Sequence, residues 1–340
     1  MGSGHWSTDA YQAAAAYRAV RGTDAFGYDA IIRTRPYQDW RVHPDLDPRG
    51  VRFRESRDST EHPTSTPVAV LFDVTGSMGS VPRMLQTKLP DLFGLLTHRR
   101  YVAHPQILFG AVGDATTDRV PLQIGQFESD NRMDDQLGSI LLEGGGGGQL
   151  TESYQLAAYF MARHTALDCH QKRGERGFLF MIGDEMAYPT VRASEVRAVL
   201  GEQITEDIPT TAIFDELRRT FDVYFILPSA ASHAGNPAVL NHWRGLVGQQ
   251  VLCLDNLDAV CETIALTVGL GTGALHELDE GLSHLDQMGS TAVDSVGQAL
   301  SRVRPSTGPT GPARITGPRN RGRGRGRGHG RGGSGRTDRW

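Results

Sequence analysis

The sequence predicts an α/β protein with a doubly wound, mostly parallel sheet that carries helices on both faces. Short apolar runs typical of buried strands alternate along the chain with longer segments whose apolar residues recur at helical spacing. Two of the runs, 68–72 and 177–182, are followed by an aspartate, and the carboxyl ends of parallel strands are where such sheets place their ligands. With 340 residues, 39% of them hydrophobic, the chain has material for one large core and extensions.

The elements follow one another in the order that this fold requires. Strands are expected at 68–73, 106–113, 120–127, 177–183, 222–228 and 251–254, with 120–127 as an antiparallel edge. Helices are expected at 81–96, 133–142, 152–167, 193–200, 211–220, 239–247 and 257–270. Pro82 is tolerated because it falls in the opening turn of its helix.

The chain divides into four predicted parts. The α/β domain occupies residues 66–271, and residues 1–65 form an arm packed on it, with a helix at 8–20 and an edge strand at 51–55. Residues 272–303 form a helical extension, in which an apolar stripe either covers the domain or offers its apolar side to a partner. The stripe consists of Leu275, Leu278, Leu282, Leu285, Met288 and Val296.

The last part, 304–340, is an arginine- and glycine-rich tail that we expect to be disordered. It holds ten arginines against one acid, Asp338, a net charge of +9, which leaves −13 of the whole-chain −4 to residues 1–303. Its repeat 321–328 resembles the arginine–glycine segments of RNA-associated proteins, which implies weak RNA or DNA binding. The alternative is a solvated tail that folds back onto its own acidic domain.

Composition also predicts the compartment. No window carries about 18 or more continuous apolar residues, and the start of the chain lacks a signal-peptide pattern. The three cysteines, Cys169, Cys253 and Cys261, have no metal-site spacing and fit buried, reduced thiols. We therefore expect a cytoplasmic protein with no membrane contact.

Oxygen-bearing side chains gather where the first strand ends. Asp73, Thr75 and Ser77 alternate directly after the apolar run 68–72. Two hydroxyls and a carboxylate suit Mg²⁺, which prefers oxygen ligands and keeps several positions for water. This turn predicts a cation site at the edge of the sheet.

Two distant segments supply further ligands of the same kind. Five consecutive glycines, 144–148, precede Thr151, and glycine tolerates the backbone angles needed to fold tightly over a metal. Asp184 follows the strand 177–182. For each residue alone the ordinary role is a turn or a helix cap, and it is their combination that favours a metal site.

Together these segments resemble the metal-ion-dependent adhesion site of von Willebrand factor A domains, whose signature is Asp-x-Ser-x-Ser. Here it is Asp73-Val-Thr-Gly-Ser77, and the chain has Gly183-Asp184-Glu185 where the family usually has Thr-Asp-Gly. The resemblance covers about residues 66–271.

The resemblance implies Mg²⁺, or Mn²⁺, held by the hydroxyls of Thr75, Ser77 and Thr151, with Asp73 and Asp184 binding directly or through water. A position left open on the ion would take an Asp or Glu of a partner protein. Bacterial intracellular members of the family work beside AAA+ ATPases or stress-response complexes, which implies an assembly role.

Five neighbours bear on this site. Glu185 either weakens the need for an acidic partner ligand or points into solvent. Asp114 is expected to be a solvated loop acid, while Met78, Tyr188 and His233 fall in loops at the same edge and are expected to shape partner contacts.

A rival hypothesis makes the protein an enzyme. Residues 72–77 partly resemble the first motif of haloacid-dehalogenase-like phosphohydrolases, in which Asp73 would be the nucleophile beside Mg²⁺. Thr75 stands where that chemistry needs a general acid. The chain also lacks a phosphate-binding loop and the His-Glu-x-x-His and Gly-x-Ser-x-Gly motifs, so we expect no enzymatic activity.

Overall fold

The computed structural model describes residues 4–78, 80–145, 150–229 and 231–301, without the side chain of Ser77. The tail 304–340 and most of the five-glycine run therefore lie outside the described residues, and the predictions made for them remain predictions.

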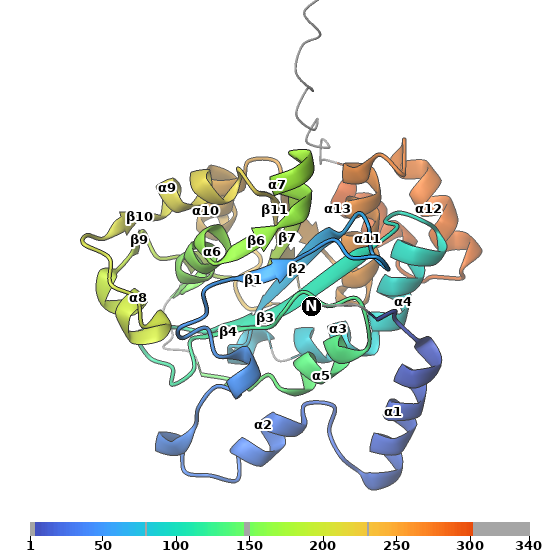
Figure 1. Cartoon of the computed structure of the whole chain (residues 1–340). Coiled ribbons are helices and arrows are strands. Elements are labelled where there is room, and N and C mark those ends of the chain that lie inside the picture. The colour runs from blue at the N-terminus through green and yellow to red at the C-terminus, as the bar shows by residue number, and fades with distance from the viewer. Residues whose placement is uncertain (1–3, 79, 146–149, 230, 302–340) are drawn as a thin grey trace, which may run out of the picture. The chain divides into compact units, whose positions relative to one another are not determined.

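A six-stranded, mostly parallel sheet forms the centre of the protein, in the order β12-β11-β7-β2-β3-β4 (Figure 1). Only β4 runs antiparallel, beside β3 at the edge, as the sequence predicts for 120–127. The strands are β2 (Thr66–Asp73), β3 (Pro105–Val112), β4 (Leu122–Ile124), β7 (Gly177–Ile182), β11 (Phe221–Pro228) and β12 (Val251–Leu254). All six expected strands are present.

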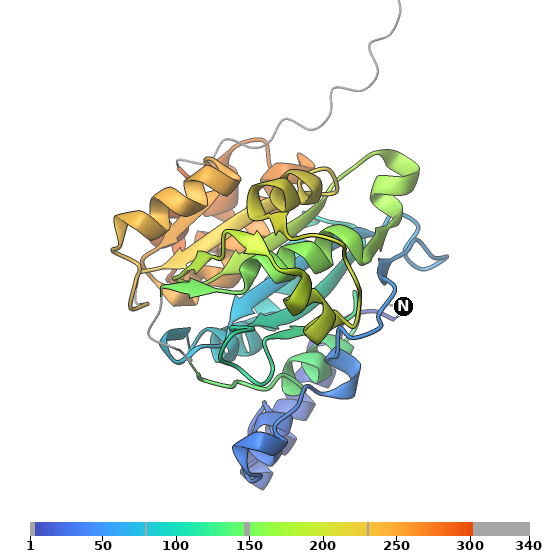
Figure 2. The same cartoon turned by 90° about the vertical axis from the view of Figure 1, so that its left-hand side faces the viewer.

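Both faces of the sheet are covered because its strands are apolar on both sides. In β2, Val68 and Phe72 enter one buried cluster with side chains of α3, α4 and α11, whereas Leu71 enters a second cluster with α6, α9 and α10. Helices therefore lie on both sides of the sheet (Figures 1 and 2). The helices are α1 (Thr8–Arg21), α2 (Gly27–Ile32), α3 (Val81–Thr87), α4 (Leu89–Phe93), α5 (Arg132–Gly138), α6 (Tyr154–Arg163), α7 (Asp168–Arg173), α8 (Ala193–Leu200), α9 (Thr210–Leu217), α10 (Pro237–Val247), α11 (Val260–Thr272), α12 (Leu278–Gln287) and α13 (Val293–Leu300).

Among the described residues, three two-stranded pairs join segments outside the central sheet. They are β1 (Arg54–Ser56) with β6 (Thr165–Leu167), β5 (Thr151–Glu152) with β8 (Met186–Ala187), and β9 (Thr190–Val191) with β10 (Ile208–Pro209). The first pair corrects the predicted helix 152–167, since α6 stops at Arg163 and the next residues pair with the arm. A helical period gives no sign of a strand partner more than a hundred residues away.

The predicted helix 81–96 is interrupted at Pro90. It is divided into α3, α4 and a π-helix, Gly94–His98. The break between α3 and α4 arises because Pro90 has no N–H to donate to the carbonyl of Gln86. That carbonyl accepts a hydrogen bond from the hydroxyl of Tyr11 in α1 instead, at 2.7 Å. The break in one helix therefore anchors the N-terminal arm.

The C-terminal stripe packs inward. Leu275, Leu285 and Val296 are buried in the same cluster as α11, while Met288 is 45% exposed. Of the two interpretations of the stripe, packing against the domain is confirmed for these residues.

All three cysteines are free, but the expectation that they are buried is wrong for Cys253, which is exposed. No helix in the described part of the chain is both long and apolar enough to span a membrane.

Candidate functional site

The predicted ligands come together at the carboxyl edge of the sheet. Asp73 ends β2, and the β2–β7 register pairs Phe72 with Ile182, so Asp184 follows at the same edge. Thr151 reaches it because β5 pairs with β8, Thr151 opposite Met186. Parallel pairing thus assembles side chains that lie up to 111 positions apart in the sequence.

The glycine-rich segment begins against the turn that follows β2. Gly144 N donates to Val74 O at 3.0 Å, and Gly76 N donates to Gly145 O at 3.1 Å. Gly144 has φ +70°, a left-handed conformation that glycine adopts without strain. Ser77 lies in the same turn, in a 3₁₀-helix over Gly76–Met78.

Asp73 is the most constrained of the predicted ligands. Its side chain is fully buried, Oδ1 accepts a hydrogen bond from Thr75 N at 2.6 Å, and Oδ2 accepts one from the hydroxyl of Tyr154 at 3.1 Å. Burial raises the pKa of Asp73 to about 7, assisted by the charge of Asp184, although the bonds from Thr75 and Tyr154 act against the rise. A proton or a cation at this carboxylate is therefore favoured near neutral pH.

Gly183 makes room for that arrangement. A Cβ atom at Gly183 would lie 1.7 Å from the hydroxyl oxygen of Tyr154 and 3.3 Å from Cβ of Asp73. Tyr154 thus occupies the space that a side chain at position 183 would need. Tyr154 belongs to an apolar helical pattern, and nothing in that pattern marks it as a partner of Asp73.

Asp184 and Thr151 are held by neighbours on the loops. Asp184 is fully buried, and its Oδ2 accepts a hydrogen bond from His233 N at 3.0 Å. The side chain of Thr151 hydrogen-bonds to Tyr188. Of the three loop residues expected at this edge, Tyr188 and His233 lie beside the predicted ligands, whereas the expectation is wrong for Met78, which is buried in the core.

Two glutamates that the sequence did not single out as ligands complete the cluster. Glu152 is 1% exposed and Glu185 is 7% exposed, so Glu185 does not point into solvent. A hydrogen bond between them requires a proton on one carboxyl group. Burial, then the charge of Asp73, raises the pKa of both, that of Glu152 farther, and the Oε2 atom of each is buried without a hydrogen-bond partner.

Asp114 belongs to the same surroundings. The expectation of a solvated loop acid is wrong, because Asp114 is fully buried and accepts hydrogen bonds from Tyr188 Oη at 3.0 Å and Thr116 N at 2.8 Å. Its position two residues after the end of β3, at the same edge as Asp73, is the signal that would have placed it here.

The cluster is short of positive charge. Within the described part of the chain, no lysine or arginine forms an ion pair with Asp73, Glu152 or Glu185, and His233 Nε2 lies 3.9 Å from Glu185 Oε1. No three His, Cys, Asp or Glu side chains of the described residues are placed to hold a metal ion by themselves. A cation here would therefore need hydroxyl and water oxygens as ligands besides carboxylates, and Mg²⁺ typically has such a coordination shell.

No family model and no curated protein matches the chain. Among solved structures, it is similar to the pilus adhesin SpaC from Lactobacillus rhamnosus GG in an open conformation, with 10% identity, TM-score 0.42, and 61% of this chain aligned to 30% of that one. It is also similar to proximal thread matrix protein 1 from the mussel byssus, with 9% identity, TM-score 0.41, and 60% of this chain aligned to 47% of that one. The chain thus spans less than half the length of either protein, and at these scores neither likeness carries an argument about this chain.

Proposed function

We propose that residues 66–271 form a doubly wound domain of the von Willebrand factor A type that binds Mg²⁺ or Mn²⁺ through Asp73, Thr75, Ser77, Thr151 and Asp184. The bound ion then recognises an acidic side chain of a partner protein. One observation carries the proposal. Several buried carboxylates meet at the edge where such sheets bind ligands, and none of the described lysines and arginines forms an ion pair with Asp73, Glu152 or Glu185.

The alternative means of neutralising the cluster is protonation. Because the pKa of Asp73 is raised to about 7, its carboxyl is only about half protonated near pH 7. A proton therefore neutralises this buried carboxylate only in part at neutral pH. A divalent cation replaces the proton and stabilises the ionised form. The protein would then gain stability on binding Mg²⁺.

The Glu152–Glu185 pair bears on the acidic partner. As long as the two share a proton they add at most one negative charge, so the ion retains attraction for a carboxylate at its open position. In an assembly, for instance beside an AAA+ ATPase or in a stress-response complex, coordination to the ion would orient the partner's carboxylate. The surrounding loops would determine which partner binds. The cytoplasm is the compartment that we propose.

Thermal unfolding with and without divalent ions tests the metal site. Saturating Mg²⁺ or Mn²⁺ should raise the melting temperature, since a ligand at about 100 times its Kd adds roughly 2.7 kcal/mol. Ser77→Ala should abolish the increase. Ser80→Ala is the matched control, because Ser80 is exposed and its side chain makes no cap hydrogen bond in α3. An unchanged melting temperature in the parent protein at millimolar Mg²⁺ would refute the proposal.

The open position needs its own measurement. Mn²⁺ bound to the protein should enhance the ¹³C relaxation of added acetate, a minimal stand-in for a partner's carboxylate, and Ser77→Ala should remove that enhancement. Bound Mn²⁺ without any effect on acetate would reject acidic recognition while keeping the metal site. Hydrolysis of a generic phosphoester that disappears in Asp73→Asn would favour the phosphohydrolase instead.

A further inference from the structure

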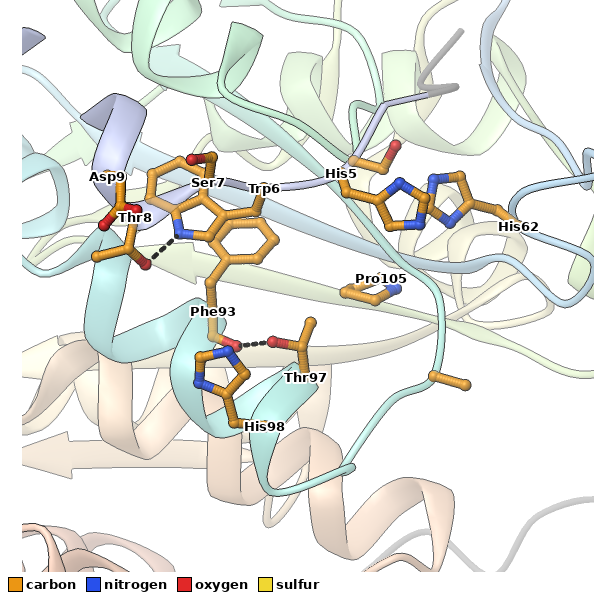
Figure 3. Close-up of a pocket in the computed structure, with 12 residues that line it drawn as sticks. His5, Trp6, Ser7, Thr8, Asp9, His62, Phe93, Thr97, His98 and Pro105 are labelled. Atoms are coloured by element: carbon orange, nitrogen blue, oxygen red, sulfur yellow. Dashed lines mark hydrogen bonds between the residues drawn. The ribbon is translucent and has the colours of Figure 1, made fainter. Parts of the chain in front are cut away.

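A cluster of histidines lies at the other end of the sheet. His62 and His104 face each other where β2 and β3 begin, with their Nδ1 atoms 3.3 Å apart. His5 lies beside them, its ring centroid 4.7 Å from that of His62 (Figure 3). These residues come from the N-terminal arm, the segment before β2 and the segment before β3, so only the fold brings them together.

The tautomer of His62 is fixed by its second nitrogen. Nε2 lies 2.8 Å from the carbonyl oxygen of Gly4, which has no proton to give, so Nε2–H is the donor. In the neutral ring the lone pair is then on Nδ1, the atom that faces His104. Metal-binding histidines are typically oriented in this way, with the other ring nitrogen donating to a backbone carbonyl.

The spacing of the two Nδ1 atoms fits a shared metal ion. Zinc–nitrogen bonds of about 2.0–2.1 Å at the tetrahedral angle place two ligand nitrogens about 3.3 Å apart. A direct hydrogen bond of 3.3 Å between them would be long, since N–H donors usually lie about 2.7–3.2 Å from their acceptors.

The backbone holds both rings in place, and a pocket gives access to them. His62 closes a turn in which its N–H donates to Ser59 Oγ at 3.0 Å, and the carbonyl of His104 accepts from Thr66 N at 2.9 Å. A pocket of about 430 Å³ is lined by His5, His62 and Ser129, with Trp6 stacked on Phe93 in its wall (Figure 3). His62 itself is 3% exposed, so an ion bound there would be largely shielded from bulk water.

We propose that His62 and His104 bind a late first-row transition-metal ion, Zn²⁺ foremost, through their Nδ1 atoms. Imidazole nitrogen suits Zn²⁺ far better than Mg²⁺, so this site and the oxygen site at the opposite edge select different ions. His5 supplies a third ligand by a rotation of its exposed side chain, and water fills the fourth position; no third acid, thiol or imidazole among the described residues is already in place.

The consequence of binding is mechanical. The ion would join the segment carrying His5, and through it α1, to the start of β3.

Cobalt substitution in the full-length protein tests the proposal. Co²⁺ is added in the presence of millimolar Mg²⁺, which occupies the oxygen site, and the visible spectrum is recorded. We expect one equivalent to bind with the intense absorption of a tetrahedral nitrogen site, and Zn²⁺ to displace it. An octahedral oxygen site would give only weak absorption, so failure of this site and failure of the Mg²⁺ site are distinguishable.

Histidine variants locate the ion. His104→Gln should weaken Co²⁺ and Zn²⁺ binding on the order of 100-fold or more, because loss of a direct ligand costs more than the roughly 10–100-fold of an outer partner. His98→Gln is the matched control, since His98 lines the same pocket outside the pair. His62→Gln should behave as His104→Gln does, and because His104 is only half-buried its variant serves even where the His62 variant fails to fold.

Three results would overturn the proposal. They are no binding of Zn²⁺ or Co²⁺ at micromolar concentration by the parent protein, equal affinity in the parent and His104→Gln proteins, and binding that is lost in Ser77→Ala but kept in His104→Gln. Each would leave His62 and His104 as a hydrogen-bonded pair.

Discussion

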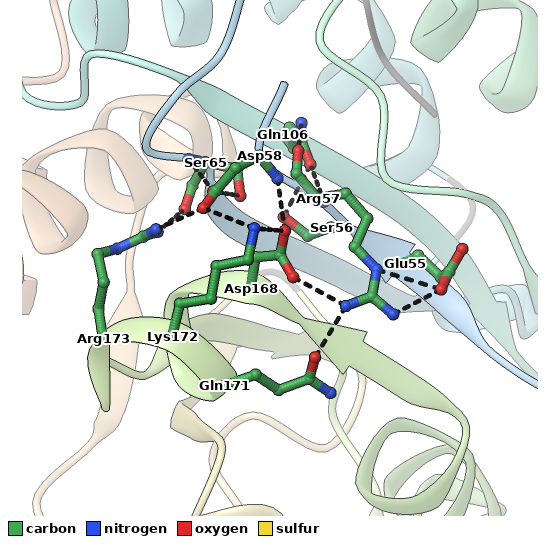
Figure 4. A network of polar contacts seen from close by, with 10 residues as sticks. All are labelled: Glu55, Ser56, Arg57, Asp58, Ser65, Gln106, Asp168, Gln171, Lys172 and Arg173. Atoms are coloured by element: carbon green, nitrogen blue, oxygen red, sulfur yellow. Dashed lines mark hydrogen bonds and ion pairs between the residues drawn. The ribbon is translucent and has the colours of Figure 1, made fainter. Parts of the chain in front are cut away.

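Two groups of carboxylates lie at opposite ends of β2, and they differ in whether basic side chains pair with them. Before the strand, Asp58 and Asp168 are surrounded by bases: Asp168 accepts from Arg57 at 2.8 Å and pairs with Lys172 at 2.7 Å (Figure 4). After the strand, Asp73, Glu152 and Glu185 form no ion pair with a lysine or arginine of the described residues; Asp73 accepts from Thr75 N and the hydroxyl of Tyr154, and His233 lies 3.9 Å from Glu185. Asp168, Asp73, Glu152 and Glu185 are buried, and the Asp58 side chain is 13% exposed.

The pKa values follow this difference. Burial alone would raise the pKa of Asp168, but hydrogen bonds from Lys172, Arg57 and Asp58 N lower it to about 2. Burial raises the pKa of Asp73 to about 7, and hydrogen bonds from Thr75 and Tyr154, not a basic side chain of the described residues, oppose that rise. The first group ties residues 55–65 to α7 and is complete as it stands, whereas the second would be completed by a cation.

The largest expected effect is the pH dependence of the metal-free protein. The pKa of Asp73 is higher in the folded state, about 7, than the ordinary 3.8, so its contribution to stability is full below pH 3.8 and is lost as the pH rises through 7. The loss amounts to roughly 4 kcal/mol, from about three pKa units.

Urea unfolding in EDTA at a series of pH values measures this loss, and saturating Mg²⁺ should flatten the profile. Asp168 contributes in the opposite sense, since its stabilisation is present above pH 3.8 and is lost as the pH falls through 2. Equal stability of the metal-free protein at pH 4.5 and pH 7.5 would mean that the two groups do not differ as described.

A single substitution in the first group, the carboxylates before β2, should have the next largest effect on stability. Asp168→Asn removes a charge that binds Arg57 and Lys172, and we expect a loss of about 2 kcal/mol in the free energy of unfolding at pH 7. Glu175→Gln is the control, because Glu175 is 62% exposed in its pair with Arg173 and should contribute less than about 0.5 kcal/mol. Equal effects of the two substitutions in urea unfolding would contradict the role given to Asp168.

Replacing a carboxylate by an amide in the second group should stabilise the metal-free protein, the opposite of the effect in the first group. Glu185→Gln removes repulsion from Asp73 and keeps a hydrogen-bonding side chain, so the metal-free protein should gain about 1 kcal/mol at pH 8. Calorimetry with and without Mg²⁺ measures the change, and the gain should shrink when the ion is present. Destabilisation in EDTA would show that Glu185 has a counter-charge after all.

Much of the architecture was predictable from local patterns. The apolar strands, their order along the chain and the antiparallel edge at 122–124 follow from periodicity, because burial on both faces leaves a continuous apolar run in the sequence. Asp73, Thr75 and Asp184 were predictable as an edge cluster for the same reason: carboxyl ends of parallel strands share one edge.

Tertiary structure alone decided the pairings that local pattern cannot encode. Residues 165–167 leave the helical pattern because 54–56 offer them backbone partners, and Tyr154 meets Asp73 because Gly183 leaves it space. Whether Glu185 faced solvent or the site, and whether Asp114 was solvated, depended on which loops cover the edge.

The sequence by itself thus determined which segments are strands and helices and where the first oxygen ligands stand, since these depend on neighbours a few residues apart. The meeting of His62 with His104, and the unequal supply of bases to the two ends of β2, were decided by the fold. Electrostatic interactions depend on distance through space and on burial, and neither is set by separation along the chain.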